Sequence, residues 1–211
     1  MTKKLIIIGA GNVGAFIAYN LNLFKGTYNL LGFLDDDVKK HGLTIAGCPV
    51  LGNVADIQGY PAGTAVAVGI ASPLIRKRIV EAIRQNHLEF PNFIARNAWL
   101  SNTVNVGKGV IIYPGVSVNY ESTLGDFVIM NMNCAIGHNA TISDFCTLAP
   151  GVNFAGFTHL EECVDIGIGA ATRQNVRLGK ASVAGGQSMI IHDVPDNAVV
   201  AGNPGRILRE Q

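Results

Sequence analysis

From residue 94 onward, apolar side chains recur at every sixth position, with no insertion that shifts the spacing. The series runs from Ile94 to Ile190, and sixteen of its seventeen members are apolar, with Thr172 as the exception. The residue four places after each member is usually small or β-branched. Three such hexads predict one triangular coil of about 18 residues, whose short strands stack on the next coil at about 4.8 Å. The pattern therefore predicts an all-β parallel β-helix.

Glycine often follows the apolar position directly. Because glycine adopts positive φ without the steric cost of a Cβ atom, we expect these residues to form the tight corners of the coils. They are Gly107, Gly125, Gly137, Gly167 and Gly179.

The first 92 residues have a different pattern, in which short apolar runs alternate with segments of helical period. The expected strands are 5–8, 30–34 and 65–70, and the expected helices are 13–23 and 74–87. This order predicts a small α/β unit with a parallel sheet, one half of a doubly wound Rossmann-like fold. We expect a Rossmann-like βαβ domain at 1–92 and the β-helix domain with its C-terminal tail at 93–211.

Charge is scarce in this chain. Only 15% of the residues are Asp, Glu, Lys or Arg and the net charge is +1, whereas an average soluble domain is about 25% charged. A hydrophobic fraction of 48% supports a large core and excludes disorder. The small net charge argues against nucleic acid or an anionic membrane as a partner.

Cysteine spacing and the N-terminal segment point to the cytoplasm. The four cysteines have neither metal-site nor redox-motif spacing, which predicts reduced, buried thiols. The apolar stretch after Lys3 and Lys4 is interrupted by glycine and asparagine, so we expect neither a signal peptide nor a membrane segment.

Short motifs spread over nearly the whole chain carry a resemblance. They are Gly9-Ala10-Gly11-Asn12-Val13-Gly14, Gly32-Phe33-Leu34-Asp35-Asp36, Val66-Ala67-Val68-Gly69, Ile136-Gly137-His138, Asp144-Phe145, Pro150-Gly151, Ala155-Gly156 and Gly202-Asn203-Pro204. With the hexads, they make the chain resemble bacterial sugar O- and N-acetyltransferases, which join a small nucleotide-binding domain to a hexapeptide-repeat β-helix. The resemblance implies a left-handed β-helix, acetyl-CoA as cosubstrate, no metal, and a homotrimer with active sites at the subunit interfaces.

The resemblance implies that His138 is the catalytic base. It stands at the third, outward-pointing position of a hexad, and neutral imidazole accepts a proton near pH 7. Gly156 occupies the same place one predicted coil later, and the resemblance implies that its N–H receives the thioester oxygen. Relatives carry an acidic residue after the catalytic histidine, where this chain has Asn139. Since Glu121 occupies the place of Asn139 one predicted coil earlier, we hypothesise that Glu121 supplies the missing carboxylate from the coil below.

Acetyl-CoA contacts are implied at Thr147, Ile168 and Gly186, with Thr147 standing where relatives have a histidine. No Lys or Arg occurs between Lys108 and Arg173. We therefore expect the coenzyme's phosphates to run toward the basic residues of the C-terminal coils. These are Arg173, Arg177, Lys180, Arg206 and Arg209.

A glycine motif opens the first predicted helix. Gly9-x-Gly11-x-x-Gly14 follows a strand, and an acidic pair ends the next strand, which taken alone suggests a dinucleotide such as NAD. About 90 residues, however, provide only half of a doubly wound sheet, enough for one nucleotide. The resemblance instead implies a nucleotide-linked sugar, held by Gly11, Asn12, Val13, Asp35, Asp36 and Gly69.

The function that we expect is acetyl-CoA-dependent N-acetylation of a UDP- or dTDP-linked 4-amino-deoxysugar in polysaccharide biosynthesis. O-acetylation of a sugar such as sialic acid remains the alternative, because it uses the same base and oxyanion donor. A zinc enzyme on this fold needs three histidines, two of them four residues apart, and His138, His159 and His192 lack that spacing. A silent scaffold predicts columns of exposed threonine and no glycine-rich nucleotide loop, and the chain matches neither.

Overall fold

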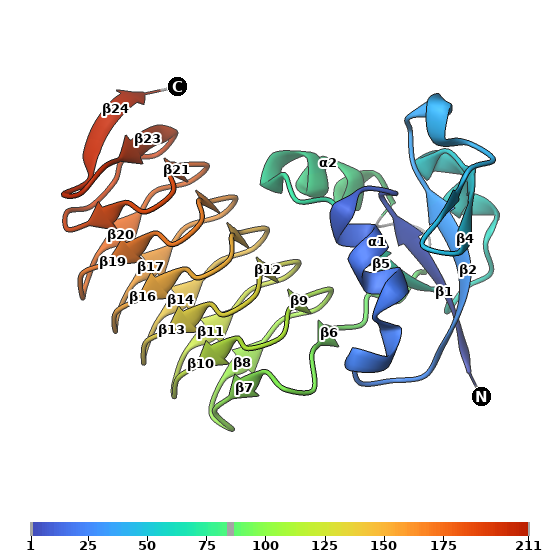
Figure 1. The fold of residues 1–211 in the computed structure, drawn as a ribbon, viewed down its shortest axis with the longest axis horizontal. Helices are drawn as coiled ribbons and strands as arrows, with labels where there is room; N and C mark the ends of the chain where they lie inside the picture. Colours follow the sequence, from blue (N-terminus) through green and yellow to red (C-terminus); the bar gives the residue numbers. More distant parts are fainter. Residues whose placement is uncertain (1, 84–86, 211) are drawn as a thin grey trace. The chain divides into compact units, whose positions relative to one another are not determined.

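The computed structural model describes residues 2–83 and 87–210, which form two compact units. The first unit extends to Ala71 and resumes at Ile75–Phe93, and the second consists of Ser72–Leu74 and the chain from Ile94 onward. Figure 1 shows the first unit in blue to teal and the stacked coils of the second in green to red.

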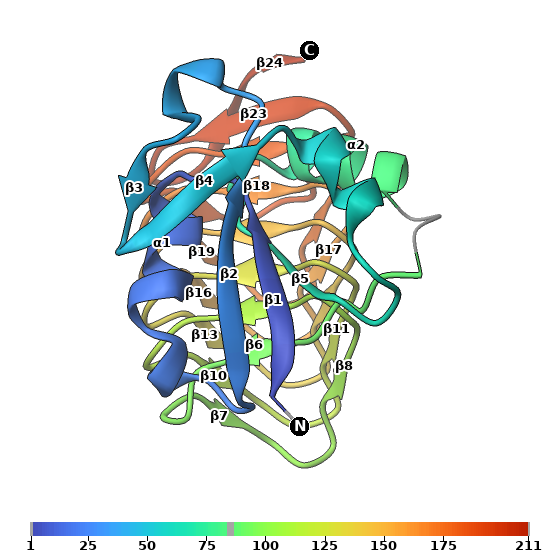
Figure 2. The same ribbon diagram turned by 90° about the vertical axis from the view of Figure 1, so that its right-hand side faces the viewer.

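The first unit is built on a parallel sheet with strand order β3-β4-β2-β1-β5, in which the short β3 runs antiparallel to its neighbour β4 (Figure 2). Its strands are β1 (Lys3–Ile8), β2 (Tyr28–Leu34), β3 (Thr44–Ile45), β4 (Cys48–Gly52) and β5 (Ala65–Val68). Its helices are α1 (Asn12–Tyr19) and α2 (Pro73–Ile83), with 3-10 turns at Leu21–Leu23, Val38–Lys40 and Val54–Gly59. The apolar runs of β1 and β5 are buried between layers, as expected for parallel strands.

The sequence prediction for this unit is confirmed for three strands and incomplete for the rest. The helix expected at 13–23 ends earlier, because the Asn20 side chain donates to the carbonyl oxygen of Phe16 at 2.9 Å and closes its last turn. The helix expected at 74–87 covers α2, but its positions 84–86 lie outside the described residues. The β3–β4 hairpin was not predicted, because Pro49 and Gly52 make Cys48–Gly52 a poor strand sequence.

The second unit is a parallel β-helix, as predicted. Each apolar hexad residue is the second residue of a two-residue strand, and each strand pairs with its equivalent in the adjacent coil, as Val118 pairs with Ile136. Its short strands are β6 (Phe93–Ile94), β7 (Trp99–Leu100), β8 (Asn105–Val106), β9 (Ile111–Ile112), β10 (Ser117–Val118), β11 (Thr123–Leu124), β12 (Ile129–Met130), β13 (Ala135–Ile136), β14 (Thr141–Ile142), β15 (Thr147–Leu148), β16 (Asn153–Phe154), β17 (His159–Leu160), β18 (Asp165–Ile166), β19 (Ala171–Thr172), β20 (Arg177–Leu178), β21 (Val183–Ala184) and β22 (Met189–Ile190). An antiparallel pair, β23 (Ala198–Ala201) and β24 (Arg206–Glu210), ends the unit.

The strands form three faces. The six-stranded face has the order β22-β19-β16-β13-β10-β7, the five-stranded face β20-β17-β14-β11-β8, and the eight-stranded face β24-β23-β21-β18-β15-β12-β9-β6. The chain passes from the six- to the five-stranded face at 119–122, 137–140, 155–158 and 173–176, which we call the six–five corner. It passes from the eight- to the six-stranded face at 149–152, 167–170 and 185–188, which we call the eight–six corner.

Two columns of side chains fill the interior: the apolar hexad residues of the strands, which we call the hexad column, and the residues four places after them. Large residues such as Leu148 and Leu160 are fully buried, and so are the small residues four places on, such as Ser122 and Cys134. The interior therefore alternates large side chains at the strands with small ones at the corners, and this alternation brings the three faces into close contact.

The prediction that the glycines after the apolar position are needed for positive φ is wrong. Positive φ falls two residues later, at positions such as Gly109, Glu121 and Asn139. The earlier glycines are needed because successive coils approach too closely for a side chain. A Cβ atom on Gly137 would lie 2.6 Å from the nitrogen of Gly156, and one on Gly167 would lie 2.5 Å from that of Gly186.

We expect two alanine substitutions to separate these effects. A Cβ atom on Gly179 would lie 2.5 Å from the backbone nitrogen of Asp196, so Gly179→Ala should lower the free energy of unfolding by about 3 kcal/mol through overpacking. Gly151 has a φ of +70° and open space around it, so Gly151→Ala should cost only about 1 kcal/mol. Urea unfolding followed by circular dichroism measures both, and equal losses would refute the close-approach explanation.

Candidate active site

The His138 side chain lies at the six–five corner between two aromatic rings. Tyr120, from the coil below, stacks on the imidazole with ring centroids 5.4 Å apart and an interplanar angle of 10°. Phe157, from the coil above, meets it edge-on at 5.1 Å. These contacts fix the plane of the imidazole, because a tilted ring would lose one of them.

A chain of hydrogen bonds joins His138 to a carboxylate. The His138 Nδ1 atom lies 2.9 Å from Asn139 Oδ1, and Asn139 Nδ2 donates to Glu121 Oε2 at 2.7 Å. The carboxylate accepts only, so it sets the orientation of the amide and places Oδ1 toward the ring. Oδ1 also accepts only, so neutral His138 carries its proton on Nδ1 and has its free lone pair on Nε2.

Gly156 lies against the free edge of the same ring. A Cβ atom at position 156 would lie 2.8 Å from His138 Nε2 and Cε1, so this position requires glycine. The absence of a side chain on Gly137 likewise leaves the Gly156 nitrogen uncovered. The structure thus places His138 Nε2 against the backbone of Gly156, so that a base and a backbone N–H could act on one acyl group.

A groove of about 440 Å³ begins next to this pair on the six-stranded face. Its lining is mostly small and uncharged. It comprises Trp99, Ser117, Asn119, Ala135, Ile136, Gly137, Asn153, Phe154, Ala155, Ala171 and Thr172. None of these side chains is charged, which suits an uncharged part of a ligand.

The predicted coenzyme contacts form a separate group. Ile168 and Gly186 meet at the eight–six corner, where a Cβ on Gly186 would lie 3.1 Å from Ile168 Cγ2. Thr147 belongs to β15 of the eight-stranded face. Within one chain, these residues and His138 lie on opposite sides of the six-stranded face and are not brought together.

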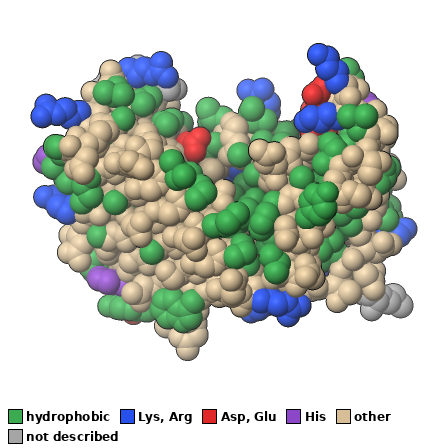
Figure 3. Space-filling view, in the orientation of Figure 1, with side chains coloured by type: hydrophobic (Ala, Val, Ile, Leu, Met, Phe, Trp, Pro, Cys, Tyr) green, Lys and Arg blue, Asp and Glu red, His purple; other side chains and the backbone are tan. Residues whose placement is uncertain are grey.

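The basic residues expected near phosphate differ in their surroundings. The Arg177 side chain is engaged by carboxylates, with Nε 3.1 Å from Glu161 Oε1 and Nη2 3.7 Å from Asp196 Oδ1. Arg173 is exposed at the six–five corner, one coil after Ala155. Of these two, Arg173 is the better placed for an anion near His138. Figure 3 shows how few charged side chains the visible face carries.

In the first unit, the glycine motif forms the start of α1. Gly14 and Gly69 serve packing, since a Cβ on Gly69 would lie 2.7 Å from Gly14 Cα. Gly11 has open space around it, and both Gly11 and Asn12 are exposed at the N-terminus of the helix. Val13 is half-buried. The exposed backbone amides of Gly11 and Asn12 are therefore accessible to a phosphate.

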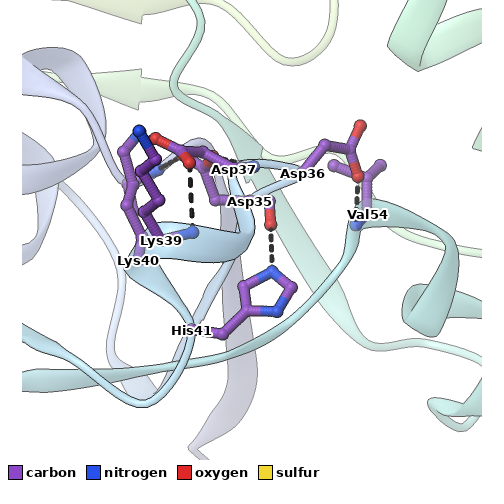
Figure 4. A network of polar contacts seen from close by, with 8 residues as sticks. Asp35, Asp36, Asp37, Lys39, Lys40, His41 and Val54 are labelled. Carbon is purple, nitrogen blue, oxygen red and sulfur yellow. Dashed lines mark hydrogen bonds and ion pairs between the residues drawn. The ribbon is translucent and has the colours of Figure 1, made fainter.

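Asp35 and Asp36 follow β2 and have different tasks (Figure 4). The Asp35 carboxylate accepts from Ala10 N–H at 2.7 Å and from Lys40 Nζ at 2.9 Å through Oδ2. Its Oδ1 atom accepts from Asp37 N–H at 2.9 Å. Asp35 thereby ties the glycine loop to the end of β2.

Asp36 faces two cavities. Its Oδ1 atom accepts from the N–H of Val54 at 2.9 Å. It lines a cavity of about 160 Å³ together with Gly9, Asp35 and Ile70, and a more apolar one of about 270 Å³ with Ile57. Asp36 is therefore the better placed of the two acids to contact a ligand.

Two further observations concern the described residues only. Nowhere in residues 2–83 and 87–210 do three His, Cys, Asp or Glu side chains gather as a metal site would require. Neither α1 nor α2, nor any other helix in that part of the chain, has the length and apolar character of a membrane span.

Known proteins match both units. Residues 4–83 match the family described as the PglD N-terminal domain. GDP-perosamine N-acetyltransferase of Escherichia coli O157:H7 is 27% identical over 96% of this chain and 95% of its own length. The acetyltransferase domain of PglB from Neisseria gonorrhoeae FA1090 superposes with a TM-score of 0.88 at 29% identity, covering 98% of this chain and all of that one.

Over nearly its whole length, the chain is therefore similar to bacterial sugar acetyltransferases. A variant of perosamine N-acetyltransferase from Caulobacter crescentus, in complex with CoA and GDP-perosamine, has the same fold, with a TM-score of 0.90 at 23% identity and full coverage of this chain. The chain spans only about half of other relatives, such as 46% of the serine acetyltransferase of Synechococcus elongatus, which is 30% identical.

Sequence reasoning did not find two residues of this acetyltransferase's candidate site, Tyr120 and Phe157. The register of the coils contained the signal for both. Tyr120 occupies the place of His138 in the coil before it, and Phe157 occupies the place of Asn139 in the coil after it. Both therefore stand on adjacent coils at the same corner, in contact with the imidazole.

We expect Asp35→Asn to destabilise the first unit in a pH-dependent way. Burial acts to raise the pKa of Asp35, but hydrogen bonds from Lys40, Asp37 N–H and Ala10 N–H outweigh it and hold this pKa below its usual 3.8. The ionised form therefore favours the folded state, and this contribution is present at neutral pH and lost as the pH falls through the folded-state pKa. The loss at pH 7 should be about 2 kcal/mol.

Urea unfolding of the full chain at pH 7 and pH 3 measures this difference, with Asp37→Asn as the exposed control. A penalty for Asp35→Asn that stays the same at both pH values would contradict the assignment.

Proposed function

We propose that this acetyltransferase transfers the acetyl group of acetyl-CoA to the amino group of a nucleotide-linked 4-amino-deoxysugar. The observation that carries the proposal is the pairing of His138 Nε2 with the backbone of Gly156, in a chain of this family. The two perosamine N-acetyltransferases, which align over nearly their whole length, act on an amino group, which favours N-acetylation over O-acetylation.

The reaction needs one proton transfer and one oxyanion donor. As the sugar amine attacks the thioester carbonyl, His138 Nε2 takes a proton from the nitrogen, and the Gly156 N–H stabilises the negative charge that develops on oxygen. Collapse of the tetrahedral intermediate forms the amide bond, breaks the carbon–sulfur bond and releases CoA, whose thiolate takes the proton from the imidazolium. No covalent enzyme intermediate is required.

Acetyl-CoA supplies the activated acetyl group, and two groups of residues would hold it. Gly156 serves the thioester, while Thr147, Ile168 and Gly186 serve the rest of the coenzyme. Because these groups occupy different corners of one chain, we propose a homotrimer in which one chain's His138 corner faces the Ile168 corner of the next. Phe157 is 49% exposed and Ile168 59%, as expected of side chains that an interface covers.

The first unit would bind the nucleotide part of the acceptor. Its phosphates would lie at the amides of Gly11, Asn12 and Val13, and Asp36 would contact the ribose or base at the cavity it lines. Asp35 and Gly69 would support this site through packing and hydrogen bonds. The nucleotide in the relatives is GDP, so GDP joins UDP and dTDP as a candidate.

Asn139 and Glu121 would orient and support the base. The amide holds the His138 tautomer that leaves Nε2 free, and the Glu121 carboxylate stabilises the imidazolium from a distance through Asn139. Relatives with an acid directly after the histidine would achieve this with one residue, whereas this chain uses two.

We expect His138→Ala to lower kcat by about 10³-fold with little change in the KM of acetyl-CoA, because the base acts mainly in the transition state. CoA release is measured with a thiol reagent and a panel of GDP-, UDP- and dTDP-linked amino sugars plus sialic acid. His159→Ala is the matched control, since His159 contacts Glu161 on the five-stranded face. CoA release with sialic acid and with no amino sugar would show O-acetylation instead of N-acetylation. Full activity of His138→Ala would overturn the mechanism.

The enzyme's own thiols interfere little with this assay. Cys134, Cys146 and Cys163 are buried, and burial raises the pKa of Cys134 to about 11. Cys48 is half-buried, and an enzyme-only blank corrects for it.

We expect Glu121→Gln to move the acidic limb of the pH–rate profile to lower pH, because the imidazolium loses a distant, solvent-screened counter-charge. The amide of the variant can still accept from Asn139, which preserves the position of the ring. Glu162→Gln is the control for a change in net charge. An unmoved acidic limb would show that Glu121 gives His138 no electrostatic support.

A further inference from the structure

Thr172 is the polar exception in the apolar hexad column, and it lies next to the proposed oxyanion donor. Its side chain and that of Thr158 are both buried, and their hydroxyl oxygens are 2.7 Å apart. Thr158 Oγ1 donates to the carbonyl oxygen of Ala155 at 2.8 Å. The N–H of Ala155 donates to Thr172 Oγ1 at 3.3 Å.

These three contacts form a closed ring whose directions are determined. Because the Thr158 hydroxyl proton is committed to the Ala155 carbonyl, the hydrogen bond between the two hydroxyls must be donated by Thr172. The ring therefore runs from Ala155 N–H to Thr172, from Thr172 to Thr158, and from Thr158 back to the Ala155 carbonyl. It fixes both peptide groups of Ala155, and the second of these contains the N–H of Gly156.

The equivalent N–H groups of neighbouring coils bond differently. Gly137 N–H donates to the backbone carbonyl of Phe154 at 2.8 Å, and Arg173 N–H donates to that of Ile190 at 2.9 Å. The Ala155 N–H donates to a side-chain hydroxyl at 3.3 Å, while Phe154 and Thr172 keep the strand pairing of the other coils. Thr172 thus introduces a side-chain contact at the coil that carries Gly156.

A hydroxyl at a corner can bond the carbonyl of its own corner without a second hydroxyl in the hexad column. Ser188 also donates to a carbonyl of its own corner, that of Gly185, at 2.7 Å. That contact satisfies a buried carbonyl, and a polar residue in the hexad column is not needed for it. The hydroxyl of Thr172 is a further group, and its contacts serve the Ala155 peptides.

We propose that Thr172 and Thr158 are positioning residues for the oxyanion donor. Thr158 bonds the carbonyl of the Ala155–Gly156 peptide and increases the polarity of the Gly156 N–H at its other end, while Thr172 closes the ring and holds the direction of that N–H. The proposal rests on the proposed function, because it assigns the thioester oxygen of an acyl-CoA as the group that the N–H meets.

Isosteric and conservative variants of the full-length enzyme test it. Thr172→Val keeps the side-chain shape and places valine where the hexad column already has Val106 and Val118. We expect kcat to fall about tenfold, less than the 10²- to 10³-fold that loss of a whole donor costs, with the KM of acetyl-CoA unchanged. Thr172→Ser restores the hydroxyl and should restore kcat. Ser182→Ala, at a buried corner hydroxyl for which the described residues provide no hydrogen-bond partner, should leave kcat unchanged.

A spectroscopic measurement separates positioning from general stability. In a complex with acetyl-CoA labelled at the carbonyl carbon, without acceptor, hydrogen bonding by Gly156 should lower the carbonyl stretching frequency relative to free acetyl-CoA. In Thr172→Val and in Thr158→Val, the frequency should return toward the free value, while the affinity for CoA, which has no carbonyl at sulfur, stays the same.

The two proposals fail in different ways. No activity of the wild-type enzyme with any acceptor would overturn the proposed function. The positioning role would be overturned if the wild type is active but the carbonyl band of both valine variants stays at the wild-type frequency. It would also be overturned if kcat is unchanged in Thr172→Val. If Thr172→Val does not fold, Thr158→Val decides by the same band, because valine occupies its column at Val152 and Val164.

Discussion

Backbone hydrogen bonds between successive coils determine where every other group of the second unit lies. The N–H of Ile129, for example, donates to the carbonyl of Cys146, and the same bond recurs from coil to coil. This stacking satisfies the backbone without side chains, so charged residues are not needed along the coils. It also brings residues from separate stretches of sequence to one corner: Glu121, the pair His138 and Asn139, and Gly156.

Features that depend on the hexad period could be predicted from the sequence. Features that depend on contacts between distant segments could not. The hexad period alone predicts the coils and places Glu121 beneath Asn139, and the hydrogen bond between these two side chains confirms that placement. The reason for Gly137 and Gly167 was wrong, because a positive φ and a close approach both select glycine and sequence alone does not separate them. The β3–β4 hairpin was missed because Cys48–Gly52 owes its strand conformation to pairing with β2, in spite of Pro49.

The site residues divide in the same way. His138 and Gly156 were expected, whereas the aromatic walls Tyr120 and Phe157 were not, because contacts between rings depend on side-chain direction as well as register. In the first unit, the acidic pair looked equivalent in sequence. The structure distinguishes them, because the Asp35 carboxylate accepts from Ala10, Asp37 and Lys40 and lines one cavity, while the Asp36 carboxylate accepts from Val54 N–H and lines two. Such distinctions arise from tertiary hydrogen bonds that no local pattern encodes.

The register of the coils has a consequence for how such a protein can change in length. The residues proposed for chemistry extend over three successive coils, yet the hexad series continues to Ile190. Within that series, an insertion other than a whole coil would rotate every later side chain onto another face. The helix can therefore grow or shrink beyond Gly156 only in steps of about 4.8 Å along its axis. The length of the surface beyond Gly156 can therefore change by whole coils without altering the six–five corner that carries His138 and Gly156.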